Sequence, residues 1–322
     1  MTDQTVDRPS RFVSYAWMVV VVNLAVVLWG ALVRATGSGA GCGGHWPLCN
    51  GEILPAMANQ ATQIEFIHRV ISGIALVLVA ALWAWSLRRF RRGETARRWA
   101  WAALVLILVE ALVGAGLVLL EWVGENASAG RAASIALHLM LTFALLASLV
   151  LVAWHGGPRR PAAPPPVPLA IAAALVGGMI LVGMSGALTA LGDTLFPASS
   201  VGQGLVDDFA SGSHFLIRLR WLHPLLAASI VLGGIFWSDA RRTKVDGSGS
   251  KLRLTALRGL LLIQLAAGAA NIILLAPVWL QIVHLLLANL VWLLLVVSLA
   301  EAGVPEAVGV PTSASGARTT PA

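Results

Sequence analysis

Charged side chains are scarce in this sequence. Only 11% of its 322 residues are charged, whereas 58% are hydrophobic. A soluble domain carries about 25% charged residues. The packed core of a soluble protein cannot absorb this much apolar sequence, so a large part of it must face lipid. The scarcity of charge therefore predicts an integral membrane protein.

The net charge of +7 does not indicate a nucleic-acid-binding protein. The basic residues lie in short loops between apolar runs and do not form one basic face with interleaved aromatics. Basic loops of this kind follow the positive-inside rule, which sets the orientation of membrane helices. We therefore expect the lipid bilayer, and no nucleic acid, among the partners. The sequence leaves an oligomer open.

Eight apolar runs are long enough to cross about 30 Å of hydrocarbon, which takes about 20 helical residues. They cover residues 13–34, 66–87, 99–121, 133–154, 168–191, 217–237, 254–276 and 280–300. The first run is too long for a cleaved signal peptide, so we interpret it as a retained helix. We predict an all-α integral membrane protein with eight transmembrane helices. The polar tails 1–12 and 302–322 are predicted to be disordered.

Arginine and lysine are concentrated in alternate loops. The loops after the second, fourth and sixth runs hold basic residues at 88–98, 159–160 and 241–253. The opposite loops and their helix edges carry Arg34, Arg69, Arg131, Arg218 and Arg220. The positive-inside rule then places both termini in the cytoplasm. We expect a multi-pass protein of the cell membrane, with the loops 35–64, 122–132 and 192–216 on the extracytoplasmic side.

The chain also repeats itself. Gly30-Ala31-Leu32 resembles Gly186-Ala187-Leu188, and residues 110–115 resemble residues 264–269. His68 matches His223, and His138 matches His284, in the same order. We predict two tandem, pseudo-symmetric four-helix bundles at 13–157 and 169–301, joined by a Pro-rich cytoplasmic linker at 158–168. Since each half has an even number of helices, the halves share one orientation, and their symmetry axis runs along the membrane normal.

Four of the seven histidines occupy these repeated positions near one membrane face. Each lies about three to seven residues past the start of its apolar run, which puts all four within about 10 Å of the same hydrocarbon boundary. A helical bundle can hold a porphyrin between facing helices, and two imidazoles at matched depth can ligate one heme iron. The matched positions predict one heme between His68 and His138 and another between His223 and His284. The five arginines named above are candidates for the heme propionates.

Two alternatives stay open for these histidines. Each could be a polar residue that packs between helices, although ionisable residues inside a membrane are usually functional. Imidazole also binds zinc and copper; we consider this less favoured because no intramembrane carboxylate or thiolate is evident for each pair. His45 and His214 fall in loops and are interpreted as surface residues. His155 is too far along its helix from His138 to share a heme and is interpreted as interfacial.

The sequence has only two cysteines, Cys42 and Cys49, in the loop after the first run. On the oxidising side of a membrane, a disulfide is the default state of such a pair. A metal site with His45 is an alternative, but it lacks an obvious fourth ligand. A redox-active pair that opens and closes is another.

Three sequence elements together resemble the heme A synthase family. They are the stretch Val33-Arg34-Ala-Thr36-Gly37-Ser38-Gly39, the loop Cys42…Trp46-Pro47-x-Cys49 and the helix start Glu65-x-x-His68-Arg69. With the eight runs and four histidines, the resemblance covers nearly the whole chain. The sequence departs from the family pattern at Gly43-Gly44-His45, where a short turn with Pro or Asp is expected.

The resemblance implies an oxidoreductase that converts the C8 methyl group of heme O into a formyl group by successive hydroxylations. The product, heme A, serves terminal oxidases. By the same resemblance, His223 and His284 ligate a heme b cofactor, and His68 and His138 hold the substrate heme beside a catalytic Glu65. The implied partners are heme O, supplied by a heme O synthase, and an electron-transfer protein.

The two halves differ just before their first histidine, which supports this division. Glu65 precedes His68 by three positions, whereas Arg220 precedes His223 by three. Residues i and i+3 share a helix face, so Glu65 should approach the heme at His68 and could exchange protons there. The alternative is a carboxylate that only favours the helix N-terminus.

Two other functions remain open. A bis-histidine diheme protein could carry electrons without chemistry on the macrocycle, in which case it would not need Glu65. A heme carrier or assembly factor could present heme at the outer leaflet. Tight retention of both hemes would argue against such a carrier.

Overall fold

The computed structural model describes residues 10–56, 59–158, 166–245 and 247–302. Within these ranges the chain is helical and contains eight helical spans long and apolar enough to cross a membrane. They are α1 (Arg11–Ala35), α2 (Gln60–Arg89), α3 (Thr95–Leu119), α4 (Ala129–His155), α5 (Leu169–Leu195), α7 and α8 together (Phe215–Arg218 and Leu222–Arg242), α9 (Ser248–Ile273) and α10 (Val278–Ala302). The prediction of an all-α, multi-pass membrane protein is confirmed. The predictions for residues 1–9, 159–165 and 303–322 fall outside the described residues.

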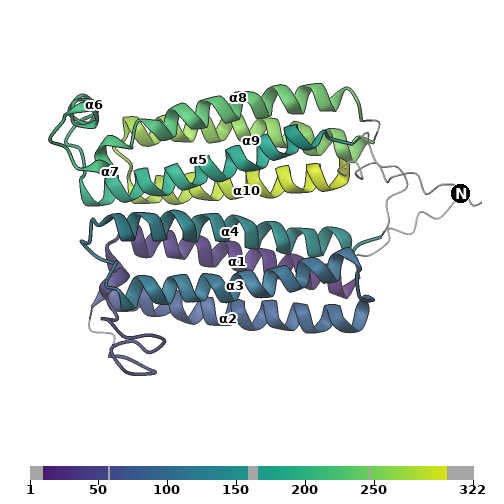
Figure 1. The fold of residues 1–322 in the computed structure, drawn as a ribbon, viewed down its shortest axis with the longest axis horizontal. Helices are drawn as coiled ribbons and strands as arrows, with labels where there is room; N and C mark the ends of the chain where they lie inside the picture. The colour runs from purple at the N-terminus through teal and green to yellow at the C-terminus, as the bar shows by residue number, and fades with distance from the viewer. Residues whose placement is uncertain (1–9, 57–58, 159–165, 246, 303–322) are drawn as a thin grey trace, which may run out of the picture.

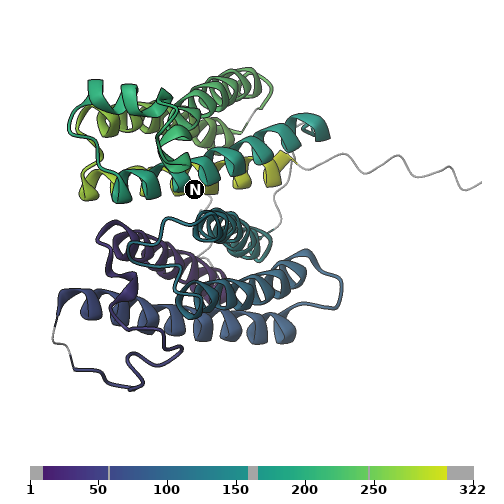
Figure 2. The ribbon, with the colours of Figure 1, turned by 60° about the vertical axis from the view of Figure 1, so that its left-hand side comes forward.

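The eight spans form two groups of four (Figure 1). Helices α1 to α4 make the first half, and α5, α8, α9 and α10 make the second. Both ribbon views place α1 and α4 on the side of the first half that faces α5 and α10 (Figure 2). We call the contact between these four helices the seam.

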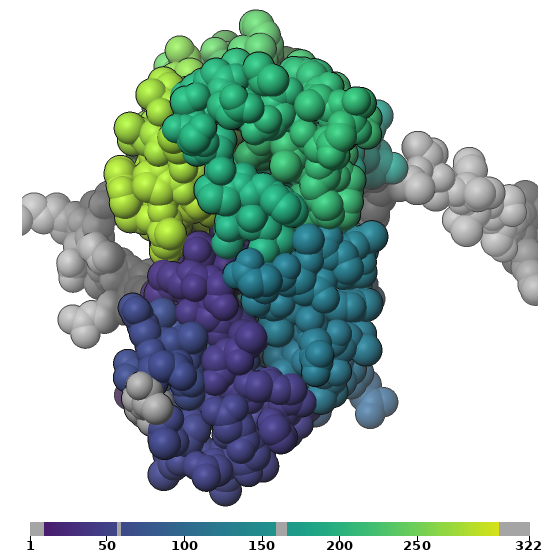
Figure 3. Space-filling view, turned by 90° about the vertical axis from the view of Figure 1, so that its left-hand side faces the viewer, coloured from purple at the N-terminus to yellow at the C-terminus, as the bar shows by residue number. Residues whose placement is uncertain are grey.

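The seam is packed as a continuous core. Phe143 of α4 stacks on Trp292 of α10 with ring centroids 5.1 Å apart, and the Trp292 indole N–H donates to the Phe143 carbonyl at 2.8 Å. Buried apolar residues from both halves belong to the same cluster as this pair. Figure 3 views one end of the molecule, where the two halves lie directly against each other. The halves are therefore one packed body.

Several helices begin before their predicted apolar runs, and one run is divided into two helices. α2 begins at Gln60, six residues before the predicted run, because Asn59 caps it by accepting the Thr62 N–H at 2.8 Å. His68 thus lies about two turns inside the helix. The sixth run is divided into α7 and α8, and Pro224 lies in the first turn of α8, where a missing N–H is tolerated.

A short helix that the hydropathy did not indicate, α6 (Val201–Phe209), precedes α7 at the same end of the molecule (Figure 1). Ser200 caps it by accepting the Gln203 N–H at 3.1 Å. It is amphipathic, with Leu205, Val206 and Phe209 exposed. With only nine residues it could not register as a membrane span.

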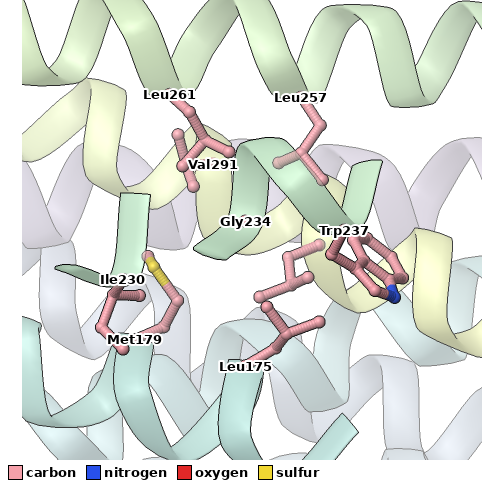
Figure 4. A pocket seen from close by; sticks show the side chains of 9 residues that line it. Leu175, Met179, Ile230, Gly234, Trp237, Leu257, Leu261 and Val291 are labelled. Atoms are coloured by element: carbon pink, nitrogen blue, oxygen red, sulfur yellow. The ribbon is translucent and has the colours of Figure 1, made fainter. Parts of the chain in front are cut away.

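The core of the second half contains one very small void of about 10 Å³. Figure 4 shows its apolar lining, which includes Leu175, Met179, Ile230, Trp237 and Leu257. A space this small holds at most one water, and an apolar lining offers that water no partners. We interpret it as a packing defect without chemistry.

Candidate functional site

A much larger cavity, of about 750 Å³, opens at the end of the bundle that carries the Cys42–Cys49 loop. We call this the disulfide end; it is the end seen in Figure 3. The cavity crosses the seam and is lined by residues from all eight spans. All four repeated histidines, His68, His138, His223 and His284, line it. Its volume lies within the range of sites for small molecules and cofactors, about 300–1,000 Å³.

In the second half, two histidine rings face each other across a gap. The ring centroids of His223 on α8 and His284 on α10 are 6.4 Å apart, and the ring planes are nearly perpendicular, at 89°. Metal–nitrogen bonds to imidazole are about 2 Å long, so the separation of the ring centroids is compatible with two imidazoles on one metal ion. Ser185 Oγ lies 3.1 Å from His223 Nδ1, and Gln264 Nε2 lies 3.2 Å from His284 Nε2.

In the first half, the second histidine has a carboxylate partner. His138 Nδ1 of α4 lies 2.8 Å from Glu110 Oε2 of α3. The Thr142 hydroxyl donates to the other oxygen of Glu110 at 2.8 Å. This contact was not predicted from the sequence: the first-half pair has an intramembrane carboxylate beside one histidine, although not each pair has one. Two signals could have revealed it: Glu110 is a carboxylate inside an apolar run, and it matches Gln264 in the repeat.

Glycines make room for three of the four rings. A Cβ added at Gly30 would lie 3.0 Å from the His68 ring, one at Gly186 would lie 2.9 Å from His223, and one at Gly268 would lie 3.2 Å from His284. These distances are closer than ordinary Cβ contacts allow. Any larger residue would push the ring toward the cavity, so these glycines set the ring positions.

The site fits the expected hemes. His68 Nδ1 and His284 Nδ1 are buried and have no hydrogen-bond partner among the described residues. A buried ring nitrogen without a hydrogen-bond partner is costly, and a neutral imidazole can ligate a metal through a nitrogen lone pair. The cavity lining is predominantly apolar, which suits a macrocycle, and cationic side chains lie toward its outer end.

Four of the five candidate arginines line the cavity: Arg34, Arg69, Arg131 and Arg220. Arg218 does not, because it is exposed at the end of α7. Arg220 pairs with Asp208 at 2.9 Å and Asp193 at 3.3 Å. The Arg131 guanidinium donates to the carbonyls of Gly124 and Asn126.

Arg34 crosses the seam. Although it belongs to α1, it donates to the Ala190 carbonyl at 2.6 Å, to Thr194 Oγ1 at 2.8 Å and to Gln281 Oε1 at 2.8 Å. Its partners on α5 and α10 belong to the second half. Gln281 precedes His284 by three residues, so Arg34 reaches the helix face that carries a second-half histidine.

Glu65 is buried, with 3% of its surface exposed, and lines the cavity. One carboxylate oxygen accepts the Cys42 backbone N–H at 2.8 Å, and the other lies 2.5 Å from the Arg69 guanidinium. Arg69 also donates to the His45 and Leu48 carbonyls, at 2.6 Å each. Glu65 and Arg69 therefore fasten the loop onto α2.

The predicted disulfide between Cys42 and Cys49 is confirmed. Because both thiols are used, a metal site with His45 is not formed. His45 is exposed, and His214 accepts the Leu216 N–H at the start of α7. His155 ends α4 at the opposite end of the bundle. None of these three histidines lines the cavity.

Comparisons with known proteins show the family of this chain. Residues 13–296 match the family model COX15-CtaA, described as cytochrome oxidase assembly protein. The chain is 48% and 47% identical, over 293 residues each, to proteins from two strains of Thermus thermophilus that are both named protoheme IX farnesyltransferase. These matches cover 89% of this chain and 48% of each relative.

A third relative is the heme A synthase of Alkalihalophilus pseudofirmus. It is 38% identical over 144 residues, which are 44% of this chain and 45% of the relative. The chain thus spans about half the length of the curated relatives it matches.

Proposed function

Because this chain belongs to the COX15-CtaA family of cytochrome oxidase assembly proteins, we propose that it is a heme A synthase that oxidises the C8 methyl group of heme O to a formyl group. The observation that carries the proposal is a cavity lined by two histidine pairs, of which only the first-half pair has glutamates at the repeat-matched positions beside its histidines. Glu65 and Glu110 belong to the first half, where the second half has Arg220 and Gln264. Relatives named heme A synthase support the same reaction.

We assign the halves different tasks. His223 and His284 would hold heme b, which when bound supplies one-electron transfer. His68 and His138 would hold the substrate heme O by its iron. Glu65 would act as an acid–base group beside the C8 methyl, taking up or returning the protons that move during the two hydroxylations and the loss of water from the resulting gem-diol. This division places Glu65 and Glu110 in the half where a substrate must gain and lose protons.

The charges of the loops indicate which side of the membrane the site faces. We propose that both termini are cytoplasmic and that the disulfide end faces the extracytoplasmic side of the cell membrane. Heme O would come from a heme O synthase, and electrons would pass to or from a separate redox protein.

The name of the Thermus relatives raises farnesyl transfer as another activity. The matched residues are 48% of each of these relatives. We propose that farnesyl transfer belongs to the part of those relatives that this chain does not match.

The proposed function is tested by the hemes that the protein carries. The full chain is expressed with a heme O synthase, purified, and its noncovalent hemes are extracted and identified by chromatography and mass spectrometry. We expect heme B together with heme A or a hydroxylated intermediate. Heme B alone, with heme O available and a competent electron partner present, would instead indicate a diheme electron carrier. Ready loss of both hemes to an acceptor protein would indicate a heme carrier.

Removing the cation that crosses the seam should weaken heme binding. Arg34→Met is expected to lower heme affinity about 10-fold, which corresponds to about 1.4 kcal/mol, because a propionate loses a charged donor. The measurement is a titration of the purified protein with hemin. Arg218→Met is the matched control, since Arg218 is an exposed arginine outside the cavity. Equal hemin affinities in Arg34→Met and Arg218→Met would show that Arg34 does not contribute to heme binding.

A further inference from the structure

We propose that Glu110 is a positioning residue that holds His138 and distinguishes the two iron sites electronically. This inference rests on the proposed heme site of the first half. Glu110 fixes the Nδ1 side of the His138 ring, which leaves Nε2 for the iron. Neither the sequence motifs nor the relatives' names assign this residue a role.

The contacts of Glu110 leave it little freedom. It belongs to α3, within a membrane span, and only 9% of its surface is exposed. One oxygen lies 2.8 Å from His138 Nδ1, and the other accepts the Thr142 hydroxyl at 2.8 Å. Thr142 Oγ1 also lies 2.9 Å from the His138 carbonyl. A carboxylate buried within a membrane is costly, so this three-residue unit indicates a function.

The second half provides an internal comparison. Gln264 occupies the position that matches Glu110, and Ala288 follows His284 by four residues as Thr142 follows His138. The Gln264 amide nitrogen lies 3.2 Å from His284 Nε2. The second half therefore lacks both the carboxylate and the hydroxyl that orients it.

The His138 ring also differs from the other three histidine rings in its glycine contacts. The rings of His68, His223 and His284 each lie against a glycine of the preceding membrane span. A Cβ added at that glycine would lie 2.9 to 3.2 Å from the ring. At Gly114, which matches Gly268, an added Cβ would meet nothing within 4 Å. The His138 ring is therefore placed by Glu110 and not by glycine packing.

A carboxylate on the far nitrogen of a metal-bound histidine fixes its tautomer and makes it a stronger donor. A stronger donor stabilises the oxidised iron more than the reduced iron. The first-half iron should thus have a lower reduction potential than it would have beside an amide. In the second half, His284 Nδ1 has no hydrogen-bond partner among the described residues, and the Gln264 amide lies on the Nε2 side. The two sites are therefore electronically different even though both use two histidines.

The test uses the purified full chain loaded with hemin, in the background His223→Ala/His284→Ala, so that only the first-half site is observed. Glu110→Gln keeps the side-chain length and an acceptor, and we expect hemin to bind with a raised reduction potential. Glu110→Ala loses the acceptor as well, and we expect about 10- to 100-fold weaker hemin binding. Glu52→Gln is the matched control, because Glu52 is an exposed carboxylate that does not line the cavity, and it should leave the potential and affinity of this site unchanged.

Unchanged potential, affinity and low-spin spectrum in both Glu110 variants would overturn the proposal. If these variants do not fold, Thr142→Val tests the same unit, because it removes the hydroxyl that orients Glu110. A raised potential in Thr142→Val supports the proposal, and an unchanged one overturns it. The readouts use hemin, so they do not depend on product formation. A wild-type chain that binds two hemes and makes no heme A would refute the proposed function while the Glu110 result still stands.

Discussion

Replacement of Glu65 by glutamine is expected to lower heme A formation about 10²- to 10⁴-fold while both hemes remain bound, which is the usual loss when a proton-transfer group is removed. Glu65 lines the cavity three residues before His68, and burial screens it from bulk water. The measurement compares heme A with heme O in extracts of the purified variant and of the wild type.

The contacts of Glu65 decide which substitution is informative. Glu65 accepts the Cys42 N–H and pairs with Arg69, so alanine would release the loop as well as remove the carboxylate. Glutamine keeps an acceptor for the N–H and changes mainly the proton-exchanging group. Glu52→Gln is the matched control, because Glu52 is an exposed carboxylate of the same loop that does not line the cavity. Unimpaired heme A formation in Glu65→Gln would refute its catalytic role.

Loss of one second-half histidine is expected to remove one heme from each chain and to abolish heme A formation. His223→Ala leaves His284 alone on one side of a 6.4 Å gap, and a single imidazole cannot ligate an iron from both sides. The bound heme is quantified per chain in wild type and variant, and we expect about half the wild-type content.

His155→Ala serves as the control for that experiment. His155 lies at the opposite end of the bundle and does not line the cavity, so heme content and heme A formation should match the wild type. A His223→Ala protein that keeps two hemes with unaltered spectra would show that the ligand assignment is wrong.

The sequence predicted the features that repeat or follow from composition. Apolar runs reveal membrane helices because a span needs about 20 apolar residues. The four histidines were evident because the same residue returned at matched positions in two halves. The disulfide followed from the oxidising side of the membrane, and it is present between Cys42 and Cys49.

The features that the sequence did not predict depend on tertiary contacts. The Glu110–His138 pair requires a particular rotation of α3 against α4, which an almost uniformly apolar helix does not reveal. Arg34 binds residues of the other half, so no local pattern indicates its partners. Arg218 and Arg220 are two residues apart, but only Arg220 lines the cavity, because the chain turns between α7 and α8.

The exchange of Glu110 for Gln264 has an evolutionary consequence. Glutamate and glutamine codons differ only at their first base, so one point mutation interconverts them. If the two halves descend from one duplicated gene segment, a single nucleotide change was enough to give the two proposed iron sites different neighbours at this position. Specialisation of one copy for the substrate and the other for electron transfer could then begin without any change in the helical scaffold.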